Sequence, residues 1–523
     1  MMEFHGKNLI GYTLSAKGNS TFNSFNVFEN VYLKTDFYNS TEEEIDAAVI
    51  FAASAFDTYK NKPGSEKAFF LECIALEIER LGETLISTAS IETGLPMARI
   101  KGERERTTGQ LRLFAALLKK GDWVNAIIDK AQPERKPLPR ADLRQMQIAL
   151  GPVAVFGASN FPLAFSVAGG DTVSALSAGC PVIFKAHPAH PCTSELVGAA
   201  IINAAIQCKM PEGVFSLVHG NTNAVGEALV KHSAIKAVGF TGSFKGGKAL
   251  YDLAVRRKEP IPFYAEMSSI NPIVFLPEIL KENYITLAEN FGASIVMGAG
   301  QFCTNPGIFL LLKDETSFKF INLLSEILAS KPAQPMLTNG IKEAYMNGIK
   351  LQVETQGTKR LTTPVNNLPL PHLLQTDVQT VLTSPHLMEE VFGPSSVAII
   401  ANDMKELIEC CHVLQGQLTT TIHGTENELN EAGLLIEVLK SKTGRLVING
   451  FPTGVEVCSA MVHGGPYPTT TDIRTTSVGT EAIYRFSRPV CYQNFPENLL
   501  PCELKDSNPL KIKRVINGEI ELN

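Results

Sequence analysis

The sequence lacks the features that identify several classes of protein. It has 10 cysteines but no C-x-x-C pair, which argues against a zinc knuckle or a redox dithiol. No long basic run precedes KIKR near its end, and the net charge is −6, so there is no concentrated basic surface for nucleic acid. No uninterrupted apolar stretch is long enough for a membrane helix, and the first residues lack the apolar segment of a signal peptide. We therefore expect a soluble, cytoplasmic protein with no nucleic-acid or membrane partner.

The length and composition indicate a multidomain globular protein. The chain has 523 residues, of which 44% are hydrophobic and 19% charged, so it is too long for one core and two or three domains are expected. The first part is predicted to be helical. A capping box formed by Thr41 and Glu44 opens one helix, and two more are expected over 65–90 and over ERERTTGQLRLFAALLKK.

Strands and helices alternate from about residue 148. The predicted strands are IALGPVAVFGAS, PVIFKA, GVFSLVHG and IKAVGFTG, and the predicted helices are DTVSALSAG, SELVGAAIINAAI, NAVGEALVKH and GGKALYDLAV. This alternation predicts parallel βαβ units and a doubly wound nucleotide-binding sheet. A second α/β region is predicted over about 266–460, with the apolar strands NPIVFL, IFLLLK and RLVINGF. The proline-rich segment 123–140 interrupts this order, and we interpret it as a hairpin arm for a partner subunit.

The stretch GFTGSFKGGKAL resembles a phosphate-binding loop that lacks one group. Gly242, Gly247 and Lys248 fit the pattern G-x-x-x-x-G-K-[ST], but Ala249 has no hydroxyl to ligate Mg²⁺. A P-loop phosphotransferase is therefore one alternative. Mg²⁺-dependent binding of ATP would identify it, and we expect that binding to be absent.

One cysteine differs from the others in its surroundings. Cys303 lies in GAGQFCTNPG, among glycines and an Asn-Pro turn, whereas a cysteine that only fills space lies on a periodic apolar face. Such a loop can position a nucleophile and leave backbone N–H groups free to stabilise an oxyanion. A thiol nucleophile beside a nucleotide-binding sheet indicates oxidation of an aldehyde through a thioester.

Four motifs in order resemble the aldehyde dehydrogenase superfamily: FTGS, AEMSSINP, GQFCTNPG and EEVFGP. Two longer stretches, FGASNFPLAFSVAGGDTVSALSAGCPVIFKAHPAHP and GFPTGVEVCSAMVHGGPYPTTTD, are similar to the branch that oxidises 2,5-dioxopentanoate (α-ketoglutaric semialdehyde) to 2-oxoglutarate. The resemblance implies NAD(P)-dependent oxidation of a small-molecule aldehyde to a carboxylic acid. A fatty or general aldehyde dehydrogenase and a catalytically silent family member are the alternatives.

The resemblance also implies the architecture. We expect an α/β fold with two doubly wound parallel-sheet domains and a small oligomerisation arm. Residues 1–122 and 148–265 would form the dinucleotide-binding domain, and residues 266–465 the catalytic domain. Residues 123–147 and 466–523 would form the arm and a C-terminal segment, and the protein would be a homodimer or homotetramer.

Three catalytic residues follow from the same motifs. Cys303 would be the nucleophile, and Glu266 in AEMSSINP resembles the base that activates the deacylating water. Asn160 in GASNFP resembles the amide that forms the oxyanion hole with the backbone N–H of Cys303. Taken singly, Glu266 could be a salt-bridged carboxylate and Asn160 a turn residue before Pro162.

The cofactor residues are likewise implied by the resemblance. The pyrophosphate would lie at GSFKGG, where backbone N–H groups at a helix N-terminus and the hydroxyl of Ser243 meet it. Binding of this kind needs no Mg²⁺, so the partial match to the phosphate-binding pattern G-x-x-x-x-G-K-[ST] is accidental. Lys185 would bind ribose hydroxyls, and Glu390 and Phe392 the nicotinamide ribose and ring. The full predicted set is Lys185, His187, Phe240, Gly242, Ser243, Gly247, Glu390 and Phe392.

The segment after Lys185 bears on the choice of cofactor. Many family members that prefer NAD carry a glutamate where this chain has Pro188. Loss of that carboxylate removes a repulsion of the 2′-phosphate, and His187 could add a donor or partial positive charge. We therefore predict NADP⁺ as the cofactor, with NAD⁺ possible. His187 and His190 have no nearby carboxylate, so no metal site is predicted.

Two departures from the family affect the substrate side. Ser268 and Ser269 replace two glycines after the base and could tighten the space beside the nicotinamide. The common Pro-Phe-Gly-Gly segment is replaced by MVHGGPYPTTTD. The residues expected near the substrate tunnel, by motif proximity, are Phe161, Phe302, Phe451 and Thr453.

Overall fold

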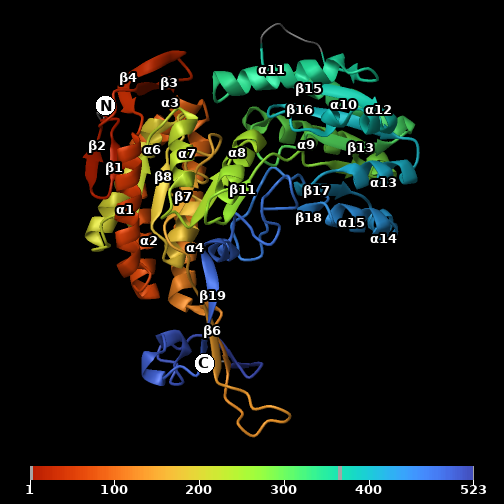
Figure 1. Ribbon diagram of the computed structural model, residues 1–523. Helices are drawn as coiled ribbons and strands as arrows, with labels where there is room; N and C mark the ends of the chain where they lie inside the picture. The colour runs from red at the N-terminus through yellow and green to blue at the C-terminus, as the bar shows by residue number, and fades with distance from the viewer. Residues whose placement is uncertain (1–3, 363–367, 522–523) are drawn as a thin grey trace.

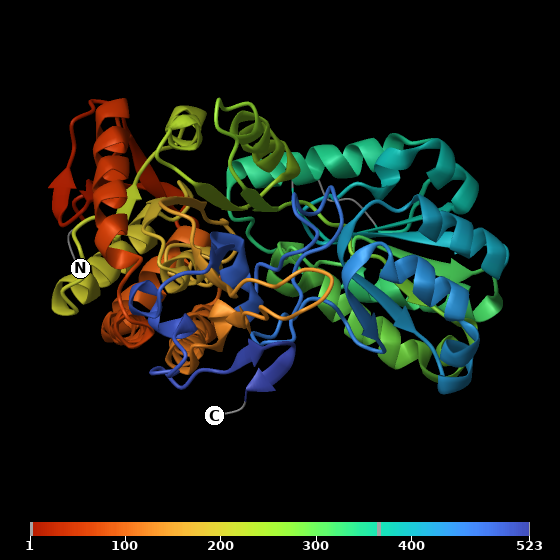
Figure 2. The same cartoon turned by 60° about the horizontal axis from the view of Figure 1, so that its bottom comes forward.

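The computed structural model describes residues 4–362 and 368–521. Two lobes lie side by side, and a thin arm extends from them (Figure 1). Seen from the arm's side in Figure 2, each lobe is a sheet covered by helices. In these described ranges, no helix is both long and apolar enough to cross a membrane.

The first lobe contains a seven-stranded sheet. Its order is β11 (Phe263–Glu266), β10 (Ala237–Thr241), β7 (Val153–Phe156), β8 (Val182–Lys185), β9 (Phe215–Val218), β1 (Asn8–Ile10) and β2 (Thr13–Ser15). The strands from β7 to β11 are parallel, while β1 is antiparallel to both of its neighbours. The connecting helices are α5 (Gly170–Ala178), α6 (Pro191–Gln207), α7 (Asn223–Lys231) and α8 (Phe244–Val255). The predicted βα alternation is confirmed.

The sequence prediction placed one strand across IALGPVAVFGAS, and this was wrong. Ile148 and Ala149 end β6 (Leu143–Ala149), which belongs to the arm, and β7 begins only at Val153. Gly151 has φ +139°, a backbone conformation that L side chains rarely adopt, and Pro152 follows it. Together they turn the chain from the arm into the sheet.

The helices before this sheet follow the predicted pattern with one correction. The capping box of Thr41 and Glu44 is present at the start of α1 (Glu42–Tyr59). The single helix expected over 65–90 is two helices, α2 (Gly64–Arg80) and α3 (Gly82–Thr93). They separate because Gly82 has φ +53°. Next comes α4 (Met97–Lys120), which packs along α2. A hairpin of β3 (Thr21–Asn26) and β4 (Val31–Tyr38) precedes α1.

The second lobe is built on another seven-stranded sheet. Its order is β14 (Lys359–Arg360), β15 (His372–Asp377), β16 (Ser395–Ala401), β13 (Ile308–Leu312), β12 (Ile273–Phe275), β17 (Gln417–His423) and β18 (Thr443–Ile448). All neighbouring strands are parallel except β14 and β15. Its helices are α9 (Pro277–Val296), α10 (Glu315–Ala329), α11 (Asn339–Glu354), α12 (Val378–Thr383), α13 (Met404–Val413), α14 (Glu426–Glu431) and α15 (Gly433–Lys440). Apolar clusters fill both faces of the sheet.

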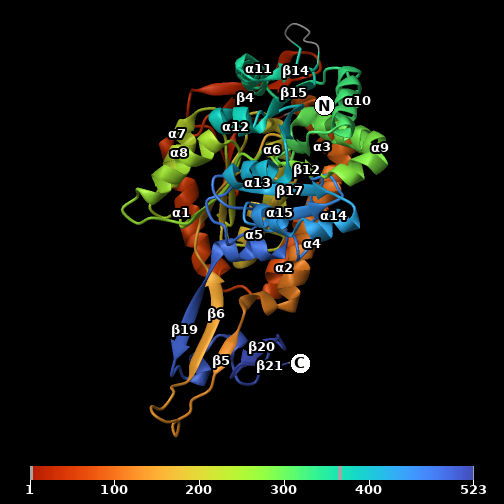
Figure 3. The same cartoon turned by 90° about the vertical axis from the view of Figure 1, so that its right-hand side faces the viewer.

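The arm combines two distant parts of the chain. Its five-stranded sheet has the order β19 (Ser487–Gln493), β6, β5 (Ile127–Asp129), β20 (Arg514–Ile516) and β21 (Glu519–Glu521). Figure 3 shows these strands extending away from both lobes. The hairpin expected after residue 123 is thus present, and the C-terminal strands complete its sheet.

Candidate active site

The loop that carries Cys303 connects α9 to β13 and is held from both sides. Before Cys303, Gly300 has φ +66°, and a Cβ there would lie 2.3 Å from the backbone of Gly393, so only glycine fits. After it, the side-chain amide of Asn271 donates to the carbonyl oxygens of Cys303, at 2.9 Å, and of Asn305, at 3.0 Å. The loop therefore presents Cys303 in a fixed position.

Glu266 and a histidine converge on Cys303. Glu266 ends β11, and its Oε1 accepts a hydrogen bond from Nε2 of His463 at 2.9 Å. The same nitrogen lies 3.5 Å from Sγ of Cys303. Ser477 donates to the other oxygen of Glu266 at 2.6 Å. Glu266 and His463 are almost fully buried, so water does not weaken these interactions.

The electrostatics of the three groups are linked. Burial alone would raise the pKa of Glu266, but the charge and hydrogen bond of His463, with bonds from Ser477 and Cys303, lower it below its usual value. Burial and the negative charge of Glu266 raise the pKa of the Cys303 thiol well above its usual value. The resting pair is therefore a carboxylate beside a neutral thiol, so Glu266 can accept the thiol proton as the thiol attacks.

His463 was missed by the sequence analysis. It lies in MVHGGPYPTTTD, the stretch that replaces the common Pro-Phe-Gly-Gly segment. A histidine inside a segment that departs from its family was the available signal. It reaches the site because its backbone N–H donates to the hydroxyl of Thr476 and its carbonyl oxygen accepts from the backbone N–H of Ser477. The hydroxyl of Ser477 donates to Glu266.

Replacing His463 should change the pH dependence of catalysis. His463→Gln removes an interaction that lowers the pKa of Glu266, while the burial that raises this pKa remains. Because Glu266 must be ionised to act as a base, the acid limb of the kcat/KM profile should move to higher pH. The same profile of His412→Gln, an exposed histidine on α13, is the control. An acid limb that stays in place would show that His463 does not act on Glu266.

Asn160 lies beside the Cys303 loop. The side-chain amide of Asn160 donates to the backbone carbonyl oxygen of Gln301 at 3.0 Å. The backbone carbonyl oxygen of Asn160 accepts from Nη2 of Arg99 at 2.8 Å. The amide is thus fixed to the loop just before Cys303. This position is compatible with a role in an oxyanion hole, and that role stays a prediction.

The N-terminus of α8 forms an open cradle above the sheet. Ser243 is the N-cap, and its hydroxyl accepts from the N–H of Gly246 at 3.3 Å, so in this structure it caps the helix. Residues 242–245 are exposed. A Cβ at Gly242 would lie 2.9 Å from the ring of Phe240, and one at Gly247 would lie 2.8 Å from Met267. The helix approaches the sheet because these positions lack side chains. The N–H groups of Phe244 and Gly246 have partners within the protein, and the positive end of the helix dipole suits a pyrophosphate at this exposed turn.

Phe240 was predicted among the cofactor-binding residues. Its side chain is largely buried in the core beneath the glycine turn, and its contact with a cofactor stays a prediction. Its ring centroid is 6.1 Å from those of Phe156 and Phe263. Phe240 supports the glycine turn from below, because an apolar ring on the sheet is more stable packed than exposed.

Lys185 and His187 follow β8. The ammonium of Lys185 donates to the carbonyl of Gly220, and burial lowers the pKa of Lys185 to about 8. Burial, with His190 and Lys185 nearby, lowers the pKa of His187 well below its usual value, so the partial positive charge expected there is absent near neutral pH. Nδ1 of His187 accepts from the N–H of Ala189 at 3.1 Å, which leaves Nε2 as its donor. Both ring nitrogens of His190 contact protein oxygens, and the absence of a metal at this pair stays a prediction.

Ser268 connects the cradle with Glu390. The hydroxyl of Ser268 accepts from the N–H of Phe244 at 3.2 Å and also bonds Glu390. Burial raises the pKa of Glu390 to about 7, against the opposing effect of this bond. Ser269 is buried, and its hydroxyl contacts Asn271 and Gln417, so it acts within the protein. Phe392, two residues after Glu390, is half-buried.

Two of the four predicted tunnel residues lie together. The rings of Phe161 and Phe302 are 5.3 Å apart, and the guanidinium of Arg99 lies over both, at 4.9 and 4.5 Å. Phe451 instead packs on Phe291 in the core of the second lobe. Thr453 is buried, with its hydroxyl 3.3 Å from that of Ser294.

The catalytic cluster also has the donor types of a metal site. One donor atom each from Glu266, Cys303 and His463 lies within 4.8 Å of the others. Thiolate, imidazole and carboxylate are ligands that zinc accepts. In this structure the three groups instead form hydrogen bonds with one another. The expectation that no metal takes part stays a prediction.

Comparisons with known proteins show what the whole chain is similar to. Residues 15–484 match the aldehyde dehydrogenase family. The chain is 48% identical, over 99% of its own length and 100% of the relative, to alpha-ketoglutaric semialdehyde dehydrogenase 2 of Azospirillum brasilense. It is also 48% identical, over 100% of both chains, to the alpha-ketoglutaric semialdehyde dehydrogenase of Acinetobacter baylyi.

Solved structures show the same fold at low identity. An aldehyde dehydrogenase of Bacillus cereus in complex with NAD⁺ superposes with a TM-score of 0.79, at 20% identity, over 94% of this chain and 96% of that one. A 1-pyrroline-5-carboxylate dehydrogenase from Thermus with bound NAD superposes with a TM-score of 0.78, at 18% identity, over 94% and 92%.

Proposed function

The chain belongs to the aldehyde dehydrogenase family, and we propose that it oxidises 2,5-dioxopentanoate to 2-oxoglutarate through a thioester on Cys303. The observation that carries the chemistry is the convergence of Cys303, His463 and Glu266 within hydrogen-bonding distance. The substrate is proposed from the two relatives named for this semialdehyde, which match the whole chain at 48% identity.

The geometry supports a definite order of steps. The Cys303 sulfur attacks the aldehyde carbon as Glu266 takes the thiol proton, which gives a tetrahedral alkoxide on the enzyme. A nicotinamide cofactor bound beside this carbon would supply the acceptor for its hydride. Glu266 then releases the thiol proton to solvent. The resulting thioester reacts with water, and the ionised Glu266 takes a proton from that water. His463 and Ser477 hold the carboxylate of Glu266 toward Cys303 through both steps.

The cofactor would be held by groups of this chain that have room for it. The exposed first turn of α8 would meet the pyrophosphate, and Lys185 the adenosine ribose. The bond between Ser268 and Glu390 would fix the carboxylate on the nicotinamide side. The glycines of the cradle support this, because a side chain at Gly242 or Gly247 would clash with Phe240 or Met267.

The substrate proposal predicts an order of aldehydes. At pH 7.5, kcat/KM for 2,5-dioxopentanoate should exceed that for acetaldehyde or dodecanal by at least about a hundredfold, the range that a site built for a substrate's polar group can reach. Absorbance of the reduced nicotinamide measures it. The reverse order would assign the protein to fatty or general aldehyde oxidation.

We also propose that NADP⁺ is preferred over NAD⁺. Pro188 carries no charge to repel a 2′-phosphate, and Lys185 supplies a cation, although neutral His187 adds only a donor. Pro188→Glu should lower kcat/KM for NADP⁺ by about tenfold or more relative to NAD⁺. The reason is that a carboxylate within a few ångströms of the 2′-phosphate repels it by more than about 1 kcal/mol. The neutral variant Pro188→Gln is the control. A wild-type enzyme that does not use NADP⁺, or a glutamate variant that does not shift, would contradict this preference.

The arm supports the proposal that copies of this chain associate. β19 and β21 are the edge strands of its sheet, and Leu138 and Leu499 expose more than half of their surfaces. Open edges and exposed apolar side chains favour contact with another copy. Analytical ultracentrifugation should therefore find a dimer or tetramer, and a monomer at micromolar concentration would contradict this.

A further inference from the structure

Three arginines surround the approach to the site, and two of them are already engaged. The guanidinium of Arg99 lies over Phe161 and Phe302, and its Nη2 donates to Asn160. Both terminal nitrogens of Arg445 donate to carbonyls of the loop beyond β18: Nη1 to Gly454 at 2.7 Å and Nη2 to Pro452 at 2.6 Å. Each therefore has only one buried nitrogen without a hydrogen-bond partner in the described structure.

Arg106, on α4, is different. Its Nη1 donates to the carbonyl of Val455, which ties the same loop to the first lobe. Its Nε and Nη2 are closed off from bulk solvent and have no hydrogen-bond partner among the described residues. These two nitrogens form one edge of the guanidinium, and this edge matches the two oxygens of a carboxylate. A buried cationic edge without partners is costly, so it indicates a ligand.

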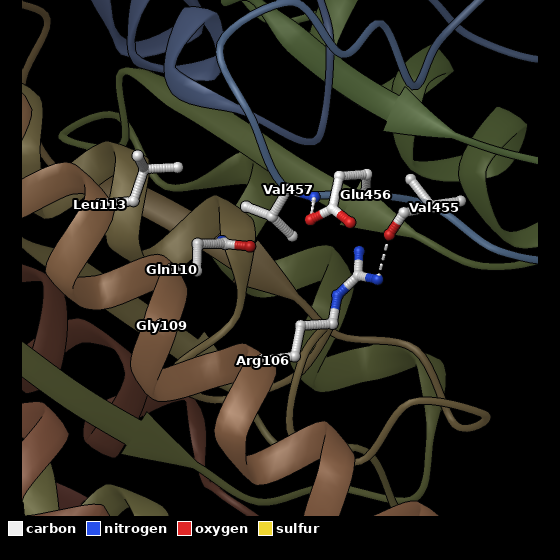
Figure 4. Close-up of a pocket in the computed structure, with 7 residues that line it drawn as sticks. All are labelled: Arg106, Gly109, Gln110, Leu113, Val455, Glu456 and Val457. Atoms are coloured by element: carbon white, nitrogen blue, oxygen red, sulfur yellow. Dashed lines mark hydrogen bonds between the residues drawn. The ribbon is translucent and has the colours of Figure 1, made fainter.

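The surroundings of Arg106 suit a short substrate. A cavity of about 490 Å³ lies between α4 and the loop 455–457, and Arg106 lines it together with the apolar side chains of Leu113, Val455 and Val457 (Figure 4). Gln110 and Glu456 also line it, and Arg106 is the one cation among the lining residues. The apolar part suits a short carbon chain, and the cation suits a carboxylate at the end of that chain.

Arg106 is also electrostatically coupled to the catalytic cluster. Its guanidinium lies 5.6 Å from the ring of Phe165, and that ring is 6.0 Å from the ring of His463. One aromatic ring thus separates Arg106 from a residue that contacts Cys303. The positive charge of Arg106 acts to lower the pKa of Cys303 against the larger effect of burial, so the two groups lie within each other's field.

Resting on the proposed function, we propose that Arg106 binds the carboxylate of the semialdehyde through Nε and Nη2 and so selects aldehydes with an anionic end. Glu456, at the mouth of the same cavity, opposes this binding. Its exposed carboxylate interacts with Arg106, and it would compete with the substrate for this cation.

The test compares two aldehydes of equal length, 5-oxopentanoate and pentanal, which differ in the terminal carboxylate. The measured quantity is kcat/KM for 5-oxopentanoate divided by kcat/KM for pentanal. Arg106→Gln should lower this ratio about a hundredfold, mainly through a higher KM for 5-oxopentanoate, because truncating one partner of a buried charge pair has an effect of this size. Arg106→Lys keeps the charge without the paired donors and should fall in between. Arg112→Gln, on an exposed arginine of the same helix that pairs with Glu79, should leave the ratio unchanged.

The outcomes separate this inference from the proposed function. A wild-type enzyme that favours pentanal over both 5-oxopentanoate and 2,5-dioxopentanoate would contradict the proposed substrate. A wild type that favours the anionic aldehydes, combined with a ratio unchanged in Arg106→Gln, would overturn the role of Arg106 alone. If Arg106→Gln does not fold, Glu456→Gln decides: the ratio should rise about threefold on loss of the competing charge, and an unchanged ratio would overturn the inference.

Discussion

Cys303→Ala should abolish oxidation of every aldehyde and leave cofactor binding intact. In the proposed mechanism the thiol forms the covalent intermediate, and removing such a nucleophile lowers turnover by at least about a thousandfold. Cofactor affinity should not change, because the proposed cradle at α8 makes no use of the thiol. Initial rates measure the first effect, and calorimetric titration with NADP⁺ measures the second.

The control for this variant is another cysteine. Cys491 is exposed on β19 of the arm, and Cys491→Ala should keep full activity. If Cys303→Ala retained even about a tenth of the wild-type turnover, a fraction too large for loss of a nucleophile, the covalent step would lie elsewhere.

Glu266→Gln should slow hydrolysis of the thioester more than its formation. Glutamine keeps the shape of the side chain and an oxygen for His463, but it cannot take a proton from water, so deacylation should slow by about 10²–10⁴-fold. Loss of the negative charge should also lower the pKa of Cys303, because the carboxylate of Glu266 raises it. The thiol can then still attack. Stopped-flow absorbance should show a burst of one reduced nicotinamide per active site, followed by a slow steady rate.

Ser477→Ala provides the comparison for Glu266→Gln. It removes one hydrogen bond to Glu266 and leaves the base in place, so its steady rate should fall far less and no burst should develop. A Glu266→Gln enzyme that loses the burst together with the steady rate would show that attack by the thiol depends on Glu266 at least as strongly as hydrolysis does.

The parts of the fold that the sequence predicted are those fixed by local pattern. Strands such as β8 and β10 are short apolar runs beside amphipathic helices, and their alternation determines a parallel sheet. The capping box of α1 is equally local. The sequence prediction was wrong about two element boundaries, each of which is set by the backbone angle of a single glycine. Gly82 divides the predicted helix over 65–90, and Gly151 divides the predicted strand, and neither position interrupts the apolar pattern.

In the candidate site, too, the residues found from the sequence are those in local motifs, and the residues missed are those that only the fold brings to the site. Cys303 and Glu266 lie in recognisable motifs, and the structure brings them together. His463 is 197 positions from Glu266, and only the loop after β18 carries it to the site. Arg106 is one of several arginines on α4, and only the fold shows that two of its nitrogens lack partners. Long-range contacts of this kind leave no periodic signal in a sequence.

Mass spectrometry of the acyl-enzyme tests the central claim most directly. Glu266→Gln, mixed with 2,5-dioxopentanoate and excess NADP⁺ and quenched in acid after the burst, is digested and its peptides are mapped. The account predicts the mass of a 2-oxoglutaryl group on the peptide that contains Cys303, in proportion to the reduced nicotinamide formed. An unmodified Cys303 peptide beside a full burst, or an acyl group on another cysteine, would contradict it.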